Sequence, residues 1–125
     1  MHSKTKIRDA DLSDLDALVL LEISANQAPW TRAALSSELA NPRSRVLLAS
    51  TDAGEVVGYA VVQVVVDSAE VLNIAVVPAQ RRQHVGQSLL DALIAHVRAA
   101  GATQLHLEVR ERNVAARALY DRNGF

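Results

Sequence analysis

The stretch that decides the fold is Gln80-Arg81-Arg82-Gln83-His84-Val85-Gly86-Gln87-Ser88-Leu89-Leu90, a basic loop that contains one glycine. Before it, residues 71–78 are rich in β-branched side chains and end at a proline. After it, apolar residues recur at helical spacing: Leu89, Leu90, Leu93, Ile94 and Val97. The loop is therefore expected at a helix N-terminus, where unpaired N–H groups and the helix dipole favour an anion. This pattern predicts a pyrophosphate-binding loop.

Composition limits the classes of protein to consider. The chain has 125 residues, half of them hydrophobic, which predicts a single domain with one core. Its formal net charge of -1 gives no long-range attraction to nucleic acid or to an anionic membrane, so neither is expected as a partner. The absence of cysteine excludes disulfides, thiolate metal sites and a cysteine nucleophile.

The beginning of the chain and its longest apolar stretch bear on where the protein works. Residues 1–6 lead into charged residues without the apolar core of a signal peptide. The apolar stretch 56–66 is too short for a membrane span, which needs about 20 residues. The sequence therefore predicts a cytoplasmic protein.

The first third of the chain predicts a short strand and two helices. Ile7-Arg8 is typical of a strand, and Asp11 and Asp14 suit the cap and first turn of a helix that runs to about Ala25. The apolar face predicted for this helix consists of Leu12, Leu15, Leu18, Val19 and Ile23. Thr31 is the expected cap of a second helix, which holds the apolar residues Leu35 and Leu39. Asn41-Pro42 should end this helix.

The rest of the chain predicts a sheet with two more helices. Residues 45–50 and 56–66 are expected to pair as an antiparallel hairpin around Asp52-Ala53-Gly54-Glu55, and a third strand is expected after Asp67-Ser68-Ala69. A helix over residues 86–100 should end at Gly101, followed by a strand over 104–110 and a helix over 113–123. The order β-α-α-β-β-β-α-β-α predicts a mixed α/β domain whose sheet becomes partly parallel at the last crossover.

The loop reads Arg81-x-x-His84-x-Gly86 and resembles the coenzyme A motif of the GNAT superfamily of N-acetyltransferases, Arg/Gln-x-x-Gly-x-Gly/Ala. Three further features are similar to the RimI-type subgroup, which acetylates the N-terminal alanine of a small-subunit ribosomal protein. They are Ala28-Pro29-Trp30-Thr31, Leu72-Asn73-Ile74-Ala75-Val76, and Leu107-Glu108-Val109-Arg110-x-x-Asn113-x-x-Ala116-x-x-Leu119-Tyr120. The resemblance implies the acyl-CoA N-acyltransferase fold of this family, a mixed sheet flanked by helices, over one domain of residues 1–125.

The resemblance also implies a substrate and its binding residues. Acetyl-CoA is the expected co-substrate, with no metal ion. Its binding residues are expected to be Ile74, Ala75, Val76, Arg82, Gln83, His84, Val85, Gly86, Gln87 and Asn113. The first three would pair with the pantetheine arm through their backbone, as an added strand would. His84 departs from the family's glycine, and its Cβ restricts the approach of the backbone to phosphate.

Two residues match the family's catalytic groups. Glu108 matches the general base, which takes a proton from the acceptor amine, and Tyr120 matches the general acid, which protonates the leaving thiolate. The residues alone leave other interpretations open, because an exposed strand face explains Glu108 and a packed helix explains Tyr120. Trp30 is either a core anchor or a wall of the acceptor cleft.

These residues together predict an acetyl-CoA-dependent N-acetyltransferase that transfers acetyl directly, in a ternary complex, to the N-terminal alanine of a ribosomal protein. The alternatives are a family member acting on a small amine or a lysine side chain, and a coenzyme A-binding module with little catalysis. The family continues past the Gly-Phe dipeptide, here Gly124-Phe125, with a β-hairpin. Without it, the strand at 104–110 is an expected free edge, which predicts a monomer or a strand-exchanged dimer.

Overall fold

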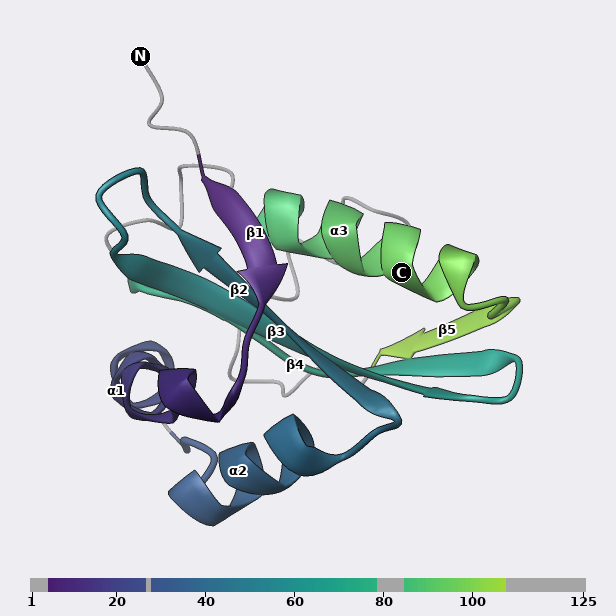
Figure 1. Cartoon of the computed structure of the whole chain (residues 1–125), viewed down its shortest axis with the longest axis horizontal. Helices are drawn as coiled ribbons and strands as arrows, with labels where there is room; N and C mark the ends of the chain where they lie inside the picture. The colour runs from purple at the N-terminus through teal and green to yellow at the C-terminus, as the bar shows by residue number, and fades with distance from the viewer. Residues whose placement is uncertain (1–4, 27, 79–84, 108–125) are drawn as a thin grey trace.

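The computed structural model describes residues 5–26, 28–78 and 85–107, which form a five-stranded sheet in the order β1-β2-β3-β4-β5 (Figure 1). The strands are β1 (Lys6–Asp9), β2 (Ser44–Ser50), β3 (Val56–Val65), β4 (Ser68–Val76) and β5 (Gln104–Leu107). The first four strands pair antiparallel, and β5 pairs parallel to β4. The predicted mixed α/β sheet and its late parallel crossover are confirmed.

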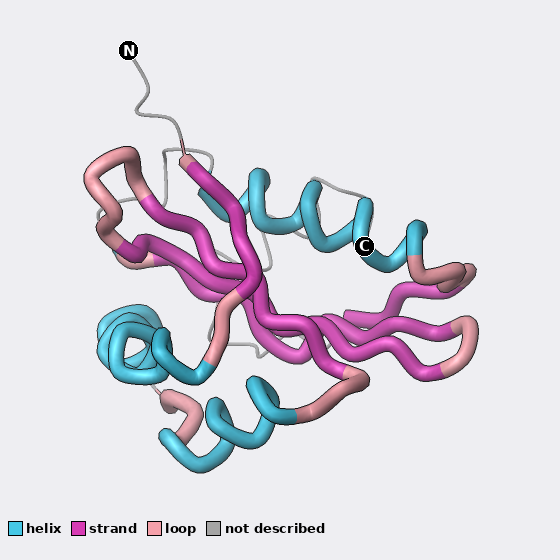
Figure 2. Tube along the Cα trace, in the orientation of Figure 1, coloured by secondary structure: helices cyan, strands magenta, loops and turns pink. Residues whose placement is uncertain are grey.

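Helices cover both faces of this sheet. Helices α1 (Leu15–Ala25) and α2 (Arg32–Ala40) lie on one face and α3 (Val85–Ala99) lies on the other (Figure 2). Because strand side chains alternate, each inner strand contributes to two separate apolar clusters. On β2, for example, Leu47 packs in the α3 cluster and Leu48 in the α1/α2 cluster. The α3 pattern predicted from the sequence is confirmed, since Leu89, Leu90, Leu93 and Val97 are buried.

Several predicted helix and turn boundaries are confirmed by hydrogen bonds. Thr31 caps α2, because its side chain accepts from the Ala34 N–H at 3.1 Å. After α3, the N–H groups of Gly101 and Ala102 each donate at 3.0 Å to the last turn, with Gly101 at φ 85°. This is the Schellman arrangement, in which glycine relieves the strain of a left-handed residue. The predicted turn at 52–55 joins β2 to β3.

The predicted apolar face of α1 was partly wrong. Leu12 and Ile23 are 59% and 61% exposed, whereas Leu18, Leu21 and Glu22 are buried. A 3₁₀ helix, Leu12–Asp14, precedes α1 and moves Leu12 away from the helical face. The sequence of α1 is apolar nearly all round, so its periodicity does not single out one face.

The predicted connection between β3 and β4 was also wrong. Asp67-Ser68-Ala69 was expected before the strand, but β4 begins at Ser68, and only Val66 and Asp67 lie between β3 and β4. Ala69 is buried in the α3 cluster, so packing overrides its low strand propensity. Val66 has φ 57°, an unusual conformation for a β-branched residue, and its side chain is exposed.

Other predictions lie outside the described residues. They concern the helix at 113–123 and residues 108–110 of the last predicted strand. No helix in the described ranges has the length and apolar character needed to cross a membrane.

Candidate functional site

The centre of β4 contains a β-bulge. Opposite β3, Val71 pairs with Val62 and Asn73 pairs with Val61, so Leu72 is an extra residue. A bulge resets the alternation of side chains. Val71 therefore belongs to the α3 cluster, while Leu72 and Asn73 both face α1. The parallel pairing described between β4 and β5 covers residues 68–71 and reaches the position where the bulge begins.

Ile74, Ala75 and Val76 follow the bulge. On one side they pair with β3, opposite Ala60, Tyr59 and Gly58. Ile74 packs toward α3 and Ala75 toward α1, so their side chains belong to the core. The described pairing of β4 with β5 ends at Val71, and the contact of residues 74–76 with a pantetheine arm stays a prediction.

Gly58 brings the two described parts of the predicted coenzyme site together. A Cβ at Gly58 would lie 3.0 Å from Leu89 Cδ1, 3.1 Å from Val85 Cγ1 and 3.1 Å from the Ala75 carbonyl oxygen. Contacts this short would force the neighbouring side chains to shift, so glycine permits the first two turns of α3 to lie close to β3 at this position. The start of α3 and the strand after the bulge therefore meet at one residue of β3.

The described part of the predicted loop opens α3. Val85 is the first residue of the helix, and its side chain is buried in the α3 cluster. Gly86 and Gln87 are half-buried, and Gln87 Nε2 donates to Asp91 Oδ1 at 2.8 Å. The other predicted loop residues, Arg82, Gln83 and His84, lie outside the described residues.

The predicted catalytic residues also lie outside the described residues, as does Asn113. Glu108 follows β5 directly, and Tyr120 comes later in the chain. Within β5, Leu105 packs against the α3 cluster, and His106 is exposed. The structure therefore places the strand that leads to Glu108 beside β4 and leaves the roles of Glu108, Asn113 and Tyr120 as predictions.

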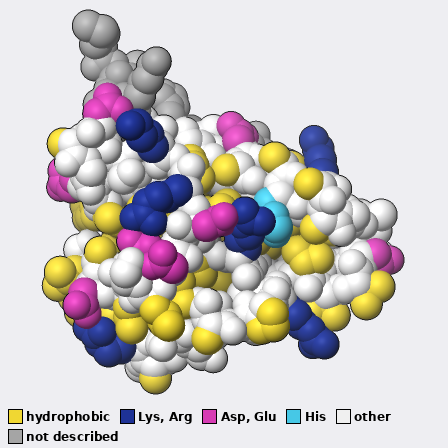
Figure 3. All heavy atoms as spheres, viewed as in Figure 1, with side chains coloured by type: hydrophobic (Ala, Val, Ile, Leu, Met, Phe, Trp, Pro, Cys, Tyr) yellow, Lys and Arg dark blue, Asp and Glu magenta, His cyan; other side chains and the backbone are white. Residues whose placement is uncertain are grey.

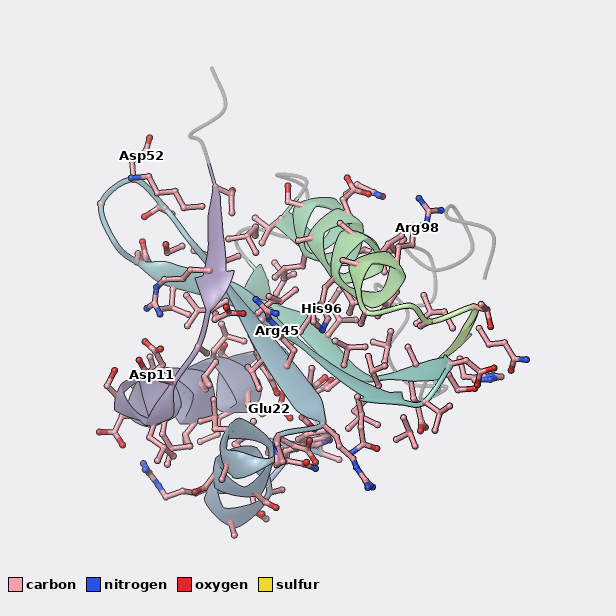
Figure 4. The ribbon with its side chains drawn as sticks, turned by 45° about the vertical axis from the view of Figure 1, so that its right-hand side comes forward. Asp11, Glu22, Arg45, Asp52, His96 and Arg98 are labelled. Carbon is pink, nitrogen blue, oxygen red and sulfur yellow. The ribbon has the colours of Figure 1, made fainter. Side chains whose placement is uncertain are left out.

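Sequence reasoning missed a buried polar cluster around Glu22, which lies between the helical layer of α1 and α2 and the sheet (Figure 4). Glu22 Oε1 accepts from Asn26 Nδ2 at 2.7 Å, Tyr59 Oη at 2.7 Å and Asn73 Nδ2 at 3.1 Å. Glu22 Oε2 accepts from the Trp30 N–H at 2.6 Å. Asn73 Nδ2 also donates to Tyr59 Oη at 2.7 Å. We call these five residues the Glu22 cluster.

Tyr59 in this cluster is held as a hydrogen-bond donor. Burial raises the pKa of its hydroxyl, and the charge of Glu22 and the hydrogen bond to it raise the pKa further. A hydroxyl with a raised pKa keeps its proton at neutral pH. Because Tyr59 is completely buried and donates to Glu22, it helps to fix the position of this carboxylate.

One signal in the sequence pointed to Glu22. It stands four residues after Leu18, on the same helical face, and between the apolar residues Leu21 and Ile23. A carboxylate on a buried face needs donors. The sequence does not reveal those donors, because Tyr59 and Asn73 are 37 and 51 residues away along the chain.

Some charged side chains elsewhere form ion pairs on the surface. On the face shown in Figure 3, acidic and basic side chains are interspersed. Arg45 on β2 forms an ion pair with Asp9 and approaches His96 Nδ1 on α3 at 3.2 Å (Figure 4). Burial lowers the pKa of His96, and the Arg45 charge lowers it further. The described residues contain no group of three His, Cys, Asp or Glu side chains that could hold a metal ion.

Comparison with known proteins identifies the family and agrees with the observed fold. The model of the acetyltransferase (GNAT) family matches residues 15–125. The chain belongs to the GNAT acetyltransferase family. It is therefore an N-acetyltransferase with the GNAT fold, and its acetyl donor is acetyl-CoA, which members of this family use.

Individual GNAT proteins are similar over most of the chain. The curated [ribosomal protein bS18]-alanine N-acetyltransferase of Escherichia coli is 38% identical over 120 residues, covering 95% of this chain and 79% of the relative. The crystal structure of the ribosomal-protein-S18-alanine N-acetyltransferase from Escherichia coli superposes with a TM-score of 0.87 at 35% identity, covering 97% of this chain and 77% of the other.

A more distant neighbour shows the fold alone. PaiA N-acetyltransferase from Thermoplasma acidophilum, solved in complex with coenzyme A, is 19% identical with a TM-score of 0.86. The superposition covers 98% of this chain and 89% of the neighbour.

Proposed function

We propose that this GNAT enzyme acetylates the N-terminal alanine of ribosomal protein bS18, with acetyl-CoA as donor. The observation that carries the proposal is the 38% identity to the Escherichia coli enzyme of that name, which extends over 95% of the chain. Two of the features that resemble this subgroup lie in the described residues: the segment 28–31 between α1 and α2, and residues 72–76 of β4.

The proposed chemistry is a direct transfer. The α-ammonium of an alanine has an ordinary pKa of about 7.7–8.0, so it must lose a proton before its nitrogen attacks the thioester carbonyl. Glu108 takes that proton, directly or through one water. When the tetrahedral intermediate collapses, the C–S bond breaks, Tyr120 protonates the departing thiolate, and the acetyl group stays on the alanine nitrogen.

The proposed acetyl-CoA site has two parts. Ile74, Ala75 and Val76 offer backbone groups to the pantetheine arm, with Asn113 as a further partner. The pyrophosphate binds at the start of α3, with Arg82, Gln83, His84, Val85, Gly86 and Gln87 as the contributing residues. The surroundings of Gly58 support this arrangement, because Val85 at the start of α3 and the carbonyl oxygen of Ala75 both lie close to this one glycine.

The test is acetyl transfer to a peptide with the N-terminal sequence of bS18, detected by mass spectrometry. We expect transfer to its α-amine and none to the same peptide with a blocked N-terminus. Glu108→Gln should lower turnover by about 10²–10⁴-fold with little change in acetyl-CoA binding. Transfer only to lysine side chains or polyamines would contradict the proposed acceptor, and binding without transfer would indicate a coenzyme-binding module.

The remaining predictions concern the state of the protein. A single domain at work in the cytoplasm, as a monomer or a strand-exchanged dimer, stays a prediction. Light scattering of the purified chain measures its mass in solution and decides between monomer and dimer.

A further inference from the structure

The Glu22 cluster connects the Trp30 segment, which is a wall of the acceptor cleft in one of the two interpretations above, to the strand of β4 that would bind acetyl-CoA. Glu22 contacts the Trp30 backbone and Asn26 between α1 and α2, and it contacts Asn73 in the bulge of β4. We infer that Glu22 is a positioning residue, which fixes the Trp30 segment against the β4 bulge so that acceptor and acetyl-CoA meet in register. This inference rests on the proposed function for the placement of the two substrates.

Glu22 does not act as a catalytic base. Its side chain is completely buried, with 0% exposure. Three donors occupy Oε1 and one donor occupies Oε2, so the carboxylate already has four hydrogen bonds. A group in this state has no surface to offer a substrate, and any effect on the reaction passes through the residues it holds.

The bulge explains why such an anchor matters. Leu72 is an extra residue in β4, which interrupts the ladder with β3 and turns Asn73 toward α1. Asn73 donates to both Glu22 and Tyr59, so its side chain is fixed immediately before Ile74. The position of the proposed pantetheine-binding backbone thus depends on the cluster.

The Trp30 segment depends on the same carboxylate. Asn26 ends α1, and its side chain and the Trp30 N–H both donate to Glu22. Trp30 immediately precedes Thr31, the cap of α2. Hydrogen bonds to a charged group are stronger than neutral ones, so one carboxylate holds both segments firmly.

The decisive variant is Glu22→Gln, which keeps the volume of the side chain but replaces one acceptor oxygen with an NH₂ donor that faces other donors. We expect weaker acetyl-CoA binding by calorimetry and a fall of about tenfold or more in kcat/KM for the alanine-starting peptide, because small misplacements of reacting groups have effects of this size. KM should rise for at least one substrate.

The matched control is Asp14→Asn. Asp14 is also a buried carboxylate beside α1, but it contacts Arg8 and the Asp11 N–H, not β4 or the Trp30 segment. This change should lower the melting temperature and leave both KM values and the dissociation constant of acetyl-CoA unchanged. Loss of stability alone reduces the folded fraction and hence the apparent kcat, without changing KM.

Tyr59→Phe is the milder second variant, because it removes one hydroxyl and keeps the buried ring. It should shift the same parameters in the same direction as Glu22→Gln, by a smaller factor. If both variants, measured well below their melting temperatures, keep wild-type KM values and acetyl-CoA affinity, the inference is wrong.

Failure of the proposed function gives a different result. Wild-type protein would then leave the bS18 peptide unmodified. The acetyl-CoA affinities of Glu22→Gln and Asp14→Asn would still decide the role of Glu22, because a weaker affinity in the first and an unchanged one in the second are expected whatever the acceptor.

Discussion

The two faces of the sheet are held in different ways. On the α3 face, the buried residues are all apolar, and Leu89, Leu90 and Leu93 pack over β2, β3 and β4 without a buried charge in the described cluster. On the α1/α2 face, the apolar cluster surrounds Glu22, whose four hydrogen bonds reach helix, loop and two strands.

This difference affects what each face can specify. Apolar packing depends on area and shape, so it holds α3 on the sheet but tolerates small shifts when volumes are conserved. Hydrogen bonds to a buried carboxylate are directional and costly to leave unmade. The α3 face therefore supplies stability, and the α1/α2 face also fixes the position of the β4 bulge.

The largest expected effect comes from truncation on the α3 face. Leu93 is completely buried, and Leu93→Ala should lower the free energy of unfolding by about 2–5 kcal/mol through lost burial and a cavity. Denaturant unfolding followed by circular dichroism measures this. Leu20→Ala removes the same atoms at an exposed site on α1 and should change stability by less than about 0.5 kcal/mol. Similar losses would contradict the assigned burial.

The next effect concerns the close approach of α3 to the sheet at Gly58. Gly58→Ala should cost about 1–3 kcal/mol, because its Cβ would press on Val85 and Leu89. It should also weaken acetyl-CoA binding, measured by calorimetry, since Val85 at the start of α3 must move away from β3. The control is Gly101→Ala, which meets no neighbour within 4 Å and is strained only by φ 85°. It should cost about 1–2 kcal/mol and leave acetyl-CoA affinity unchanged.

A smaller effect is expected at the turn between β3 and β4, outside both cores. Val66→Asn should raise the free energy of unfolding by about 1 kcal/mol, because Asn tolerates the positive φ that a β-branched residue resists. The melting temperature should rise by a few degrees in calorimetry. Val65→Asn, one residue earlier and within β3, should give no such gain. An equal gain in unfolding free energy from both substitutions would mean that polarity, not backbone strain, causes the effect.

The smallest effect is expected from Asp14, the second buried carboxylate, whose partner is the Arg8 guanidinium instead of the donors around Glu22. The pKa of Asp14 lies below its ordinary value, first because of its hydrogen bonds to Arg8. Its contribution to stability is therefore present above the unfolded pKa of about 3.9 and is lost as pH falls through the lower folded value. Asp14→Asn should flatten the dependence of unfolding free energy on pH below about pH 5, by about 1 kcal/mol or less, since Arg8 is 51% exposed. Arg8→Ala should flatten it similarly, and an unchanged slope in both would contradict the assignment.

Much of the fold could be predicted because its signals are local. The caps at Thr31 and Gly101 depend on residues within one helical turn, and the structure shows both in place. Asp11 also caps a helix, but it is the 3₁₀ helix that precedes α1. The turn at 52–55 and the spacing of α3 are equally local. The buried face of α1 could not be predicted in this way, because the helix is apolar nearly all round and only packing against the sheet selects one face.

The candidate site also has a part that local sequence predicts and a part that depends on distant residues. The loop before α3 and its likeness to the GNAT coenzyme motif were legible in the sequence, and the family is confirmed. The Glu22 cluster could not be predicted, since nothing in the sequence near Glu22 indicates that Tyr59 and Asn73 will donate hydrogen bonds to it. The bulge at Leu72, which turns Asn73 toward α1, depends on the register between β3 and β4.

The sequence by itself determined the order of the described strands and α-helices, the ends of α2 and α3, and the family, because periodicity, caps and motifs are properties of neighbouring residues. Only the tertiary structure decided which face of α1 is buried, where β4 bulges, how closely α3 approaches Gly58, and which groups surround Glu22. These features depend on strand register and packing between residues far apart in the chain, and the contacts that fix them form only when the sheet and helices come together.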